Sequence, residues 1–127
     1  MKTGLDVVTR ALYLLQYTDA NGVLDHRRNA ELLRRALPVA NQIAGELWYM
    51  ENSGVFPELS SLEQEVPLSQ RTLDEAMPYG VAMLLAQSEG DGDSQQLFSA
   101  LYNRKRAGVR RLTEARLDML PRGGDTV

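Results

Sequence analysis

The sequence predicts an all-α fold, a small four-helix bundle with a long irregular segment between its second and third helices. Apolar residues recur with helical spacing in four stretches of the chain. Residues typical of helix ends or turns bound each stretch. The chain has 127 residues, which is the usual size of one domain. We therefore expect a single helical domain over residues 1–120 and a flexible C-terminal tail over residues 121–127.

The helical spacing covers residues 3–17, 25–50, 72–88 and 94–120. Thr3 is suited to cap the first helix, and Asp6 brings negative charge to the positive helix start. The sequence that begins at Thr72 matches a capping box, in which a hydroxyl and a later carboxylate accept from backbone N–H groups. Either Asp93 or Ser94 is the expected cap of the fourth helix.

Prolines and glycines interrupt this helical pattern. Pro38 lies inside the second helix and is expected to kink it, and Pro78 interrupts the third helix early. Residues 51–68 contain apolar side chains without helical spacing, so we expect an irregular segment there, with room for one short strand near residues 65–68. A loop of this length in a small domain is usually functional or disordered, and its apolar content argues against disorder in an assembled state.

Charge is unevenly distributed along the chain, although the net charge is only −3. Residues 51–93 hold nine acidic residues and one basic residue, whereas residues 94–127 hold seven basic and three acidic residues. A molecule with an acidic middle and a basic end can stack head-to-tail, with opposite charges meeting between subunits. The plainer interpretation is that the solvated helix faces are simply unequal.

Catalytic and metal-binding patterns are weak throughout the sequence, and we expect neither an enzyme nor a cofactor or metal site. The chain has no cysteine, and its single histidine, His26, is followed by Arg27 and Arg28, which suits neither a general base nor a metal ligand. The acidic pairs lie in polar stretches where nothing would desolvate them. The sequence lacks a phosphate-binding loop and any apolar run long enough to cross a membrane, which predicts a cytosolic protein.

The remaining apolar and charged side chains predict an interaction surface. Trp48, Tyr49 and the apolar residues of the irregular segment either pack beneath that segment or contact another subunit. The candidates for a subunit or partner interface are Phe56, Leu59, Leu62, Glu63, Glu65, Arg104, Lys105, Arg106, Arg110 and Arg111.

Three sequence features over residues 25–110 carry a resemblance to a known family. A long second helix leads into an irregular link that ends in Val66-Pro-Leu-Ser. The third helix then reads Leu73-Asp-Glu-Ala-Met-Pro-Tyr-Gly-Val-Ala, and a Gly-Asp break precedes Phe98-Ser-Ala-Leu-Tyr. This arrangement resembles the head-tail connector (head completion adaptor) family of tailed phages.

The resemblance implies a structural role without catalytic residues. Such proteins form a ring beneath the portal protein, extend the DNA channel and offer a platform for a tail or stopper protein, although they can be monomeric in isolation. Residues 51–68 would then reach a neighbouring subunit or the channel, where acidic side chains would let DNA pass without sequence-specific binding. The basic C-terminal helix would meet the portal or the acidic patch of an adjacent subunit. The protein would reside at the head-tail junction of the virion, and in the host cytoplasm during assembly, away from membranes.

Two other classes of protein fit the same residues. A small helical DNA-binding regulator or packaging accessory would use the basic cluster at residues 104–111 to contact phosphates, without sequence readout. A helical adaptor unrelated to phage would form a fixed small oligomer and bind a protein partner.

Overall fold

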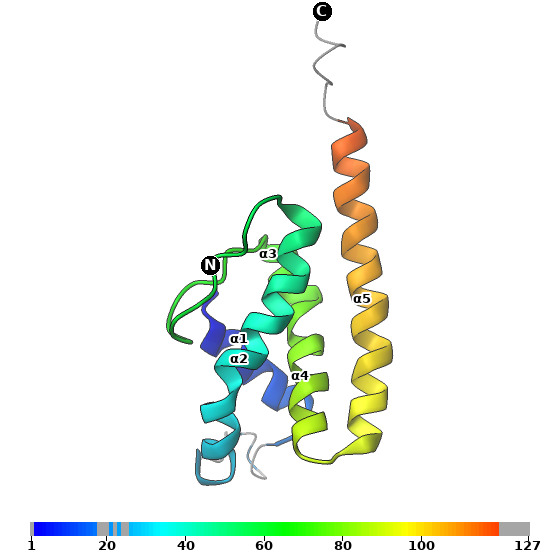
Figure 1. Cartoon of the computed structure of the whole chain (residues 1–127). Coiled ribbons are helices and arrows are strands. Elements are labelled where there is room, and N and C mark those ends of the chain that lie inside the picture. Colours follow the sequence, from blue (N-terminus) through cyan, green and yellow to red (C-terminus); the bar gives the residue numbers. More distant parts are fainter. Residues whose placement is uncertain (1, 18–20, 22, 24–25, 120–127) are drawn as a thin grey trace, which may run out of the picture.

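The structure of this protein is a computed structural model that describes residues 2–17, 21, 23 and 26–119, and it is an all-α bundle (Figure 1). Its helices are α1 (Gly4–Leu14), α2 (His26–Glu51), α3 (Gln70–Glu75), α4 (Met77–Ser88) and α5 (Gly92–Met119). The predicted all-α class is therefore confirmed, and the third predicted helix consists of two short helices in series. The predicted tail at residues 121–127 lies outside the described residues.

Helix α4 occupies the centre of the bundle and packs against α1, α2 and α5. Its sequence is apolar nearly all round, which is expected of a helix that is covered on several sides. Gly80 allows the closest approach, because a Cβ atom there would lie 2.8 Å from Ile43 Cγ2 and 2.9 Å from Tyr102 Cε1. The glycine thus sets how tightly α2 and α5 pack on α4.

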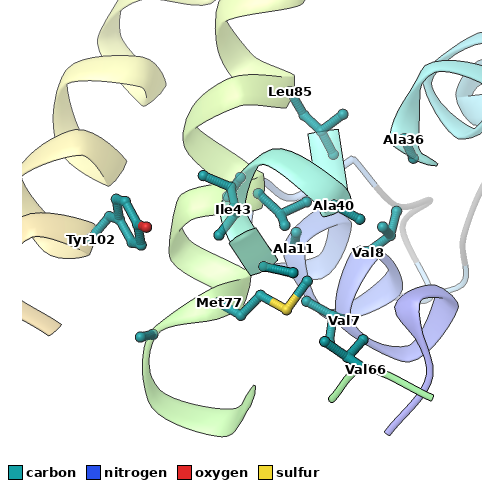
Figure 2. Packing of buried hydrophobic residues seen from close by; sticks show 14 of the residues in the cluster. Val7, Val8, Ala11, Ala36, Ala40, Ile43, Val66, Met77, Leu85 and Tyr102 are labelled. Atoms are coloured by element: carbon teal, nitrogen blue, oxygen red, sulfur yellow. The ribbon is translucent and has the colours of Figure 1, made fainter. Parts of the chain in front are cut away.

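The core lies between α1, α2 and α4, and Tyr102 approaches it from α5 (Figure 2). Val7, Val8 and Ala11 of α1 are buried against small residues of α2 and against Met77 of α4. Small side chains on α2, including Ala36 and Ala40, let the helices come close. Burial of this continuous apolar cluster is the main source of stability in such a bundle.

The break between α3 and α4 falls at Ala76 and follows from Pro78. Proline lacks an N–H group and is tolerated in the first turn of a helix but not in its interior, so α4 begins afresh at Met77. The predicted capping box at Thr72 is wrong. The cap of α3 is Ser69, whose hydroxyl accepts from the backbone N–H of Thr72, and the Thr72 side chain is buried instead.

Both ends of α1 follow local chemistry. Thr3 and Asp6 form the full reciprocal capping box of α1. Helix α1 ends at Leu14, earlier than predicted, because Gln16 adopts a left-handed conformation with φ 63°. Helix α2 continues across Pro38 as one helix.

The predicted cap of α5 is also wrong. Helix α5 begins at Gly92, and Asp91 Oδ1 accepts from the backbone N–H of Ser94, so neither Asp93 nor Ser94 is the cap. Asp91 Oδ2 also accepts from the Tyr17 hydroxyl, at 3.1 Å. The capping carboxylate therefore ties the start of α5 to Tyr17, which lies three residues beyond the end of α1.

Residues 52–69 form the expected irregular segment between α2 and α3, but the strand allowed for near residues 65–68 is absent. Within the described chain, Glu65 forms only an isolated antiparallel bridge with Thr3. The backbone of this segment pairs with the N-terminus through Gly4 N to Gln64 O at 3.0 Å and Val66 N to Lys2 O at 3.0 Å. The start of α1 limits the pairing to a single bridge, because a helix cannot continue a β-ladder.

Candidate interaction surfaces

The irregular segment is fixed to α2 by side chains that bond its backbone. Asn41 forms a two-way pair with Leu59, donating from Nδ2 to the carbonyl at 2.9 Å and accepting at Oδ1 from the N–H at 2.8 Å. The Tyr49 hydroxyl accepts from the N–H of Phe56 at 3.2 Å. Buried backbone groups need such partners, and here side chains on α2 replace a neighbouring strand.

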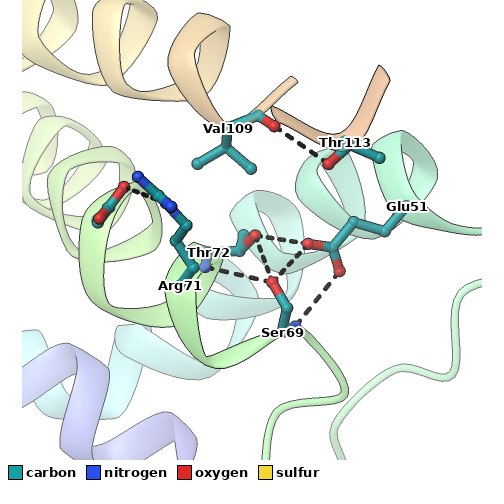
Figure 3. Close-up of polar contacts among 7 residues, drawn as sticks. Glu51, Ser69, Arg71, Thr72, Val109 and Thr113 are labelled. Carbon is teal, nitrogen blue, oxygen red and sulfur yellow. Dashed lines mark hydrogen bonds and ion pairs between the residues drawn. The ribbon is translucent and has the colours of Figure 1, made fainter. Parts of the chain in front are cut away.

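A second anchor joins the end of the segment to the last residue of α2 (Figure 3). The Glu51 carboxylate accepts from the Ser69 N–H at 3.3 Å, the Ser69 hydroxyl at 2.8 Å and the Thr72 hydroxyl at 2.5 Å. Hydrogen bonds to a charged acceptor are stronger than those between neutral groups. Glu51 therefore holds the start of α3 against the end of α2, and the segment between them is fixed at both ends.

An open groove, here called the α2 groove, runs between α2 and residues 55–59. One hollow of about 620 Å³ is lined by Asn41, Gln42, Gly45, Glu46, Tyr49, Val55, Phe56 and Glu58. Asn41, Gln42 and Glu58 also line a second hollow, which extends toward Leu37 and Pro38. At the rim, Val55 is 87% exposed and Tyr49 is 57% exposed. The groove thus combines exposed apolar surface with two glutamates and has no basic residue in its lining.

Predicted interface residues in the irregular segment fall into two groups. Phe56 and Leu59 are buried and belong to the core, and the Phe56 ring lies against Gly45 of α2. Leu62 is half-buried and packs on the same core. Of the two placements expected from the sequence, these three residues therefore pack beneath the segment. Glu63 and Glu65 are exposed.

The basic residues of α5 differ in their contacts. Lys105 Nζ lies 5.2 Å from the centre of the Tyr79 ring, and Arg106 Cζ lies 5.2 Å from the centre of the Tyr102 ring. Arg110 pairs with Glu114 one turn later, at 3.2 Å. Arg104 and Arg111 are exposed and contact no acidic side chain among the described residues. The predicted cluster therefore contributes two unpaired arginines to the surface.

A polar contact between α2 and α5 lies beside Arg106. The buried Tyr102 hydroxyl donates to Glu46 Oε2 at 3.1 Å. Burial, reinforced by the nearby Glu46 carboxylate, raises the pKa of Tyr102 well above its ordinary value. Tyr102 therefore stays protonated and acts as a fixed donor that holds α5 against α2.

Other kinds of site find no support in the part of the chain that the structure describes. It contains no group of three or more histidine, cysteine, aspartate or glutamate side chains arranged to hold a metal ion. None of the helices there has the length and apolar character to cross a membrane. The single histidine of the chain, His26, is the first residue of α2, and its side chain lies outside the described residues.

Comparisons with known proteins give no match: no protein-family model, curated protein or solved structure is significantly similar to this chain.

The anchoring roles of Asn41, Glu51 and Thr72 were not predicted from the sequence. Each carries a polar group at or beside an apolar helix face, and this is the signal that was available in the sequence. Asn41 directly follows the apolar residue Ala40, and Thr72 precedes Leu73. A polar side chain at such a position indicates a partner elsewhere in the chain, because an unpartnered buried polar group is costly.

Proposed function

We propose that this chain is a structural head-tail connector of a tailed phage or prophage, which forms a ring under the portal, extends the DNA channel and joins head to tail. The proposal starts from the resemblance over residues 25–110. It concerns a protein that acts by contact, with no chemistry of its own. Its partners would be further copies of itself, the portal protein and a tail or stopper protein.

The observation that carries the proposal is the pair of differently charged surfaces on an all-α bundle. The irregular segment presents Glu58, Glu63 and Glu65 to solvent, and α5 presents Arg104 and Arg111. In Figure 1 the segment lies on one side of the molecule and α5 on the other, and the C-terminal turns of α5 project beyond α2 and α4. Surfaces of opposite charge on different sides favour the heterologous contacts from which rings are built.

The anchoring of residues 52–69 supports the same proposal. A long irregular segment must lose much backbone entropy to become ordered, and here Asn41, Tyr49 and Glu51 supply the bonds that order it. A segment fixed in this way can present a defined surface to a partner without a further ordering cost.

The experiment that tests this proposal is reconstitution with the portal protein of the same genome. We expect light scattering to show a complex larger than either component, and electron microscopy to show a ring on the portal axis. A monomer in the absence of portal is compatible with the proposal. Failure to bind the portal when both proteins are folded would contradict it.

The second candidate is a DNA-binding regulator or packaging accessory, and the unpaired Arg104 and Arg111 favour it. Phosphate contacts by these side chains would give DNA affinity that falls steeply with salt concentration. We expect instead weak DNA binding, because the net charge of −3 and the acidic segment repel phosphate. Tight, salt-sensitive DNA binding without portal binding would favour the regulator.

A further inference from the structure

The exposed side of α5 carries a stripe with the spacing of a helix-docking seam. Residues 97, 101, 104, 108 and 111 follow one another at intervals of four and three, which is the spacing of a seam between packed helices. We call Leu97, Leu101, Arg104, Gly108, Arg111 and Leu112 the α5 outer stripe. Leu112 lies between this stripe and the core-facing stripe that contains Phe98, Tyr102 and Val109, and the other five residues lie about 100° around the helix from the core-facing stripe.

The α5 outer stripe has apolar surface that its own bundle does not cover. Leu97 is 56% exposed and Leu112 is 39% exposed, while Leu101 is half-buried. A Cβ atom on Gly108 would meet nothing within 4 Å. Glycine inside a helix is unfavourable relative to alanine, and no contact within the described chain explains its presence at this position.

The α2 groove matches this stripe in chemistry. The groove has the exposed apolar side chains Val55 and Tyr49, and its glutamates Glu46 and Glu58 form no ion pair within the part of the chain described here. The stripe has exposed leucines flanked by the unpaired Arg104 and Arg111. Charged side chains arranged in this complementary way steer association and fix its register.

We infer that the α5 outer stripe of one copy docks into the α2 groove of a second copy. Within one chain, α5 meets α2 through its core-facing side, where Tyr102 donates to Glu46, and the α5 outer stripe points away from that contact. The glycine at position 108 gives the neighbouring chain close access to the helix backbone, and the exposed Val55 at the groove rim is suited to fill that space. The contact is heterologous, so it propagates from copy to copy and closes only where the rotation permits.

This inference deepens the proposed function, since it specifies which surfaces meet within the ring. It can be tested without a portal, and the two failures are therefore distinguishable. Portal binding without this contact would overturn the inference alone, whereas the contact without portal binding would overturn the proposed function alone.

The first test is disulfide trapping, for which the cysteine-free chain is well suited. A mixture of the Val55→Cys and Gly108→Cys variants is oxidised at high protein concentration and low ionic strength. We expect a mixed dimer in at least several-fold excess over the mixture of Val55→Cys with Tyr13→Cys, because Tyr13 is 42% exposed on α1 and lies outside both surfaces. Equal trapping in the two mixtures would overturn the inference.

A chain that carries both Val55→Cys and Gly108→Cys distinguishes a heterologous contact from a symmetric one. A heterologous contact links each copy to two neighbours, so oxidation should give a ladder of oligomers on a non-reducing gel. A symmetric pairing of α5 with α5 would give Gly108→Cys dimers from that variant alone and would contradict the inference.

The second test reverses charge on each surface. Arg104→Glu with Arg111→Glu, and separately Glu58→Lys, should each lower trapping of the otherwise matched cysteine pair several-fold. The chain that carries all three reversals should recover it, because the two surfaces are again complementary. Circular dichroism confirms that each variant is folded, and loss of trapping without recovery in the combined variant would overturn the charge pairing.

Discussion

At the scale of single residues, two glycines in helices have opposite roles. Gly80 faces Ile43 and Tyr102 across distances too short for a methyl group, whereas Gly108 faces open space. The same substitution should therefore have opposite effects at the two positions, since helix propensity favours alanine at both and only packing differs between them.

We expect Gly80→Ala to lower the free energy of unfolding by about 1–3 kcal/mol, because the added methyl group forces the packed helices apart. Gly108→Ala should raise it by up to about 1 kcal/mol through helix propensity alone. Urea unfolding followed by circular dichroism measures both. A stabilising Gly80→Ala would show that α4 can move away from Ile43 without cost.

The Glu51 anchor is a second feature of this scale, because one carboxylate serves three donors. Glu51→Ala removes the charged acceptor of the buried Thr72 hydroxyl and leaves it only the Ser69 hydroxyl at 2.9 Å, and losing a hydrogen bond to a charged group costs about 1.5–3 kcal/mol. We expect that loss of stability in urea unfolding, together with faster hydrogen exchange at the Ser69 amide. Glu63→Ala is the matched control, since Glu63 is exposed, and it should change stability little. Equal effects of the two substitutions would contradict the anchoring role.

At the scale of elements, single residues determine where the helices begin and end. Pro78 separates α3 from α4, and Ser69, not Thr72, caps α3. Asp91 caps α5 and also bonds Tyr17, so one carboxylate connects two parts of the bundle. Hydrogen bonds from Ser94, with a further one from Tyr17, lower the pKa of Asp91.

We expect Asp91→Ala to destabilise the protein measurably and Asp93→Ala to do so much less. Asp91 supplies the capping bond to Ser94, whereas Asp93 only places charge in the first turn of α5. Thermal unfolding of the two variants at neutral pH compares them directly. A larger loss for Asp93→Ala would show that Asp93 is the cap and that the helix begins two residues later than described.

At the scale of the whole molecule, acid should weaken the fold through carboxylates on several elements. Hydrogen bonds from the backbone and hydroxyl of Thr3 lower the pKa of Asp6, and bonds from Lys2 and Gln70 lower the pKa of Asp74. A carboxylate with a lowered pKa stabilises the fold while it is ionised. Its contribution is fully present above the ordinary value of 3.8 and is lost as pH falls through the lower pKa of the folded state.

We therefore expect the melting temperature to be nearly constant from neutral pH to about pH 5 and to fall steeply below about pH 4. Asp6→Asn should reduce the steepness of that fall, because it removes one of the groups that must be protonated. Calorimetry across this range measures the effect. Stability that does not change down to pH 2.5 would show that these carboxylates do not favour the folded state.

The distribution of charge over the whole molecule also links the fold to the proposed assembly. The acidic irregular segment and the outer side of α5 are separated by the bundle, and each lies beside exposed apolar residues. This separation keeps the surfaces of one chain from neutralising each other. Complementary charge is then available for a neighbouring copy or for a partner.

The sequence by itself determined the all-α class, the helical stretches, the interruption at Pro78, the Gly-Asp break near residues 89–93, and the irregular linker. These features depend on hydrophobic spacing and on the backbone preferences of proline and glycine, which act between near neighbours in the chain. The Thr3 cap was predictable for the same reason, since its partner Asp6 lies three residues away.

Only the tertiary structure decided which polar groups fix the irregular segment and which apolar residues remain exposed. Asn41 meets Leu59, and Glu51 meets Ser69, across long stretches of sequence, so neither pair has a local signal. Phe56 and Leu59 were candidates for a partner surface, and they are buried because the segment folds back over α2. The caps of α3 and α5 could not be predicted from the sequence for the same reason. Several neighbouring side chains can cap each helix, and tertiary packing decides which of them are buried, as Thr72 is, or bonded elsewhere, as Asp91 is.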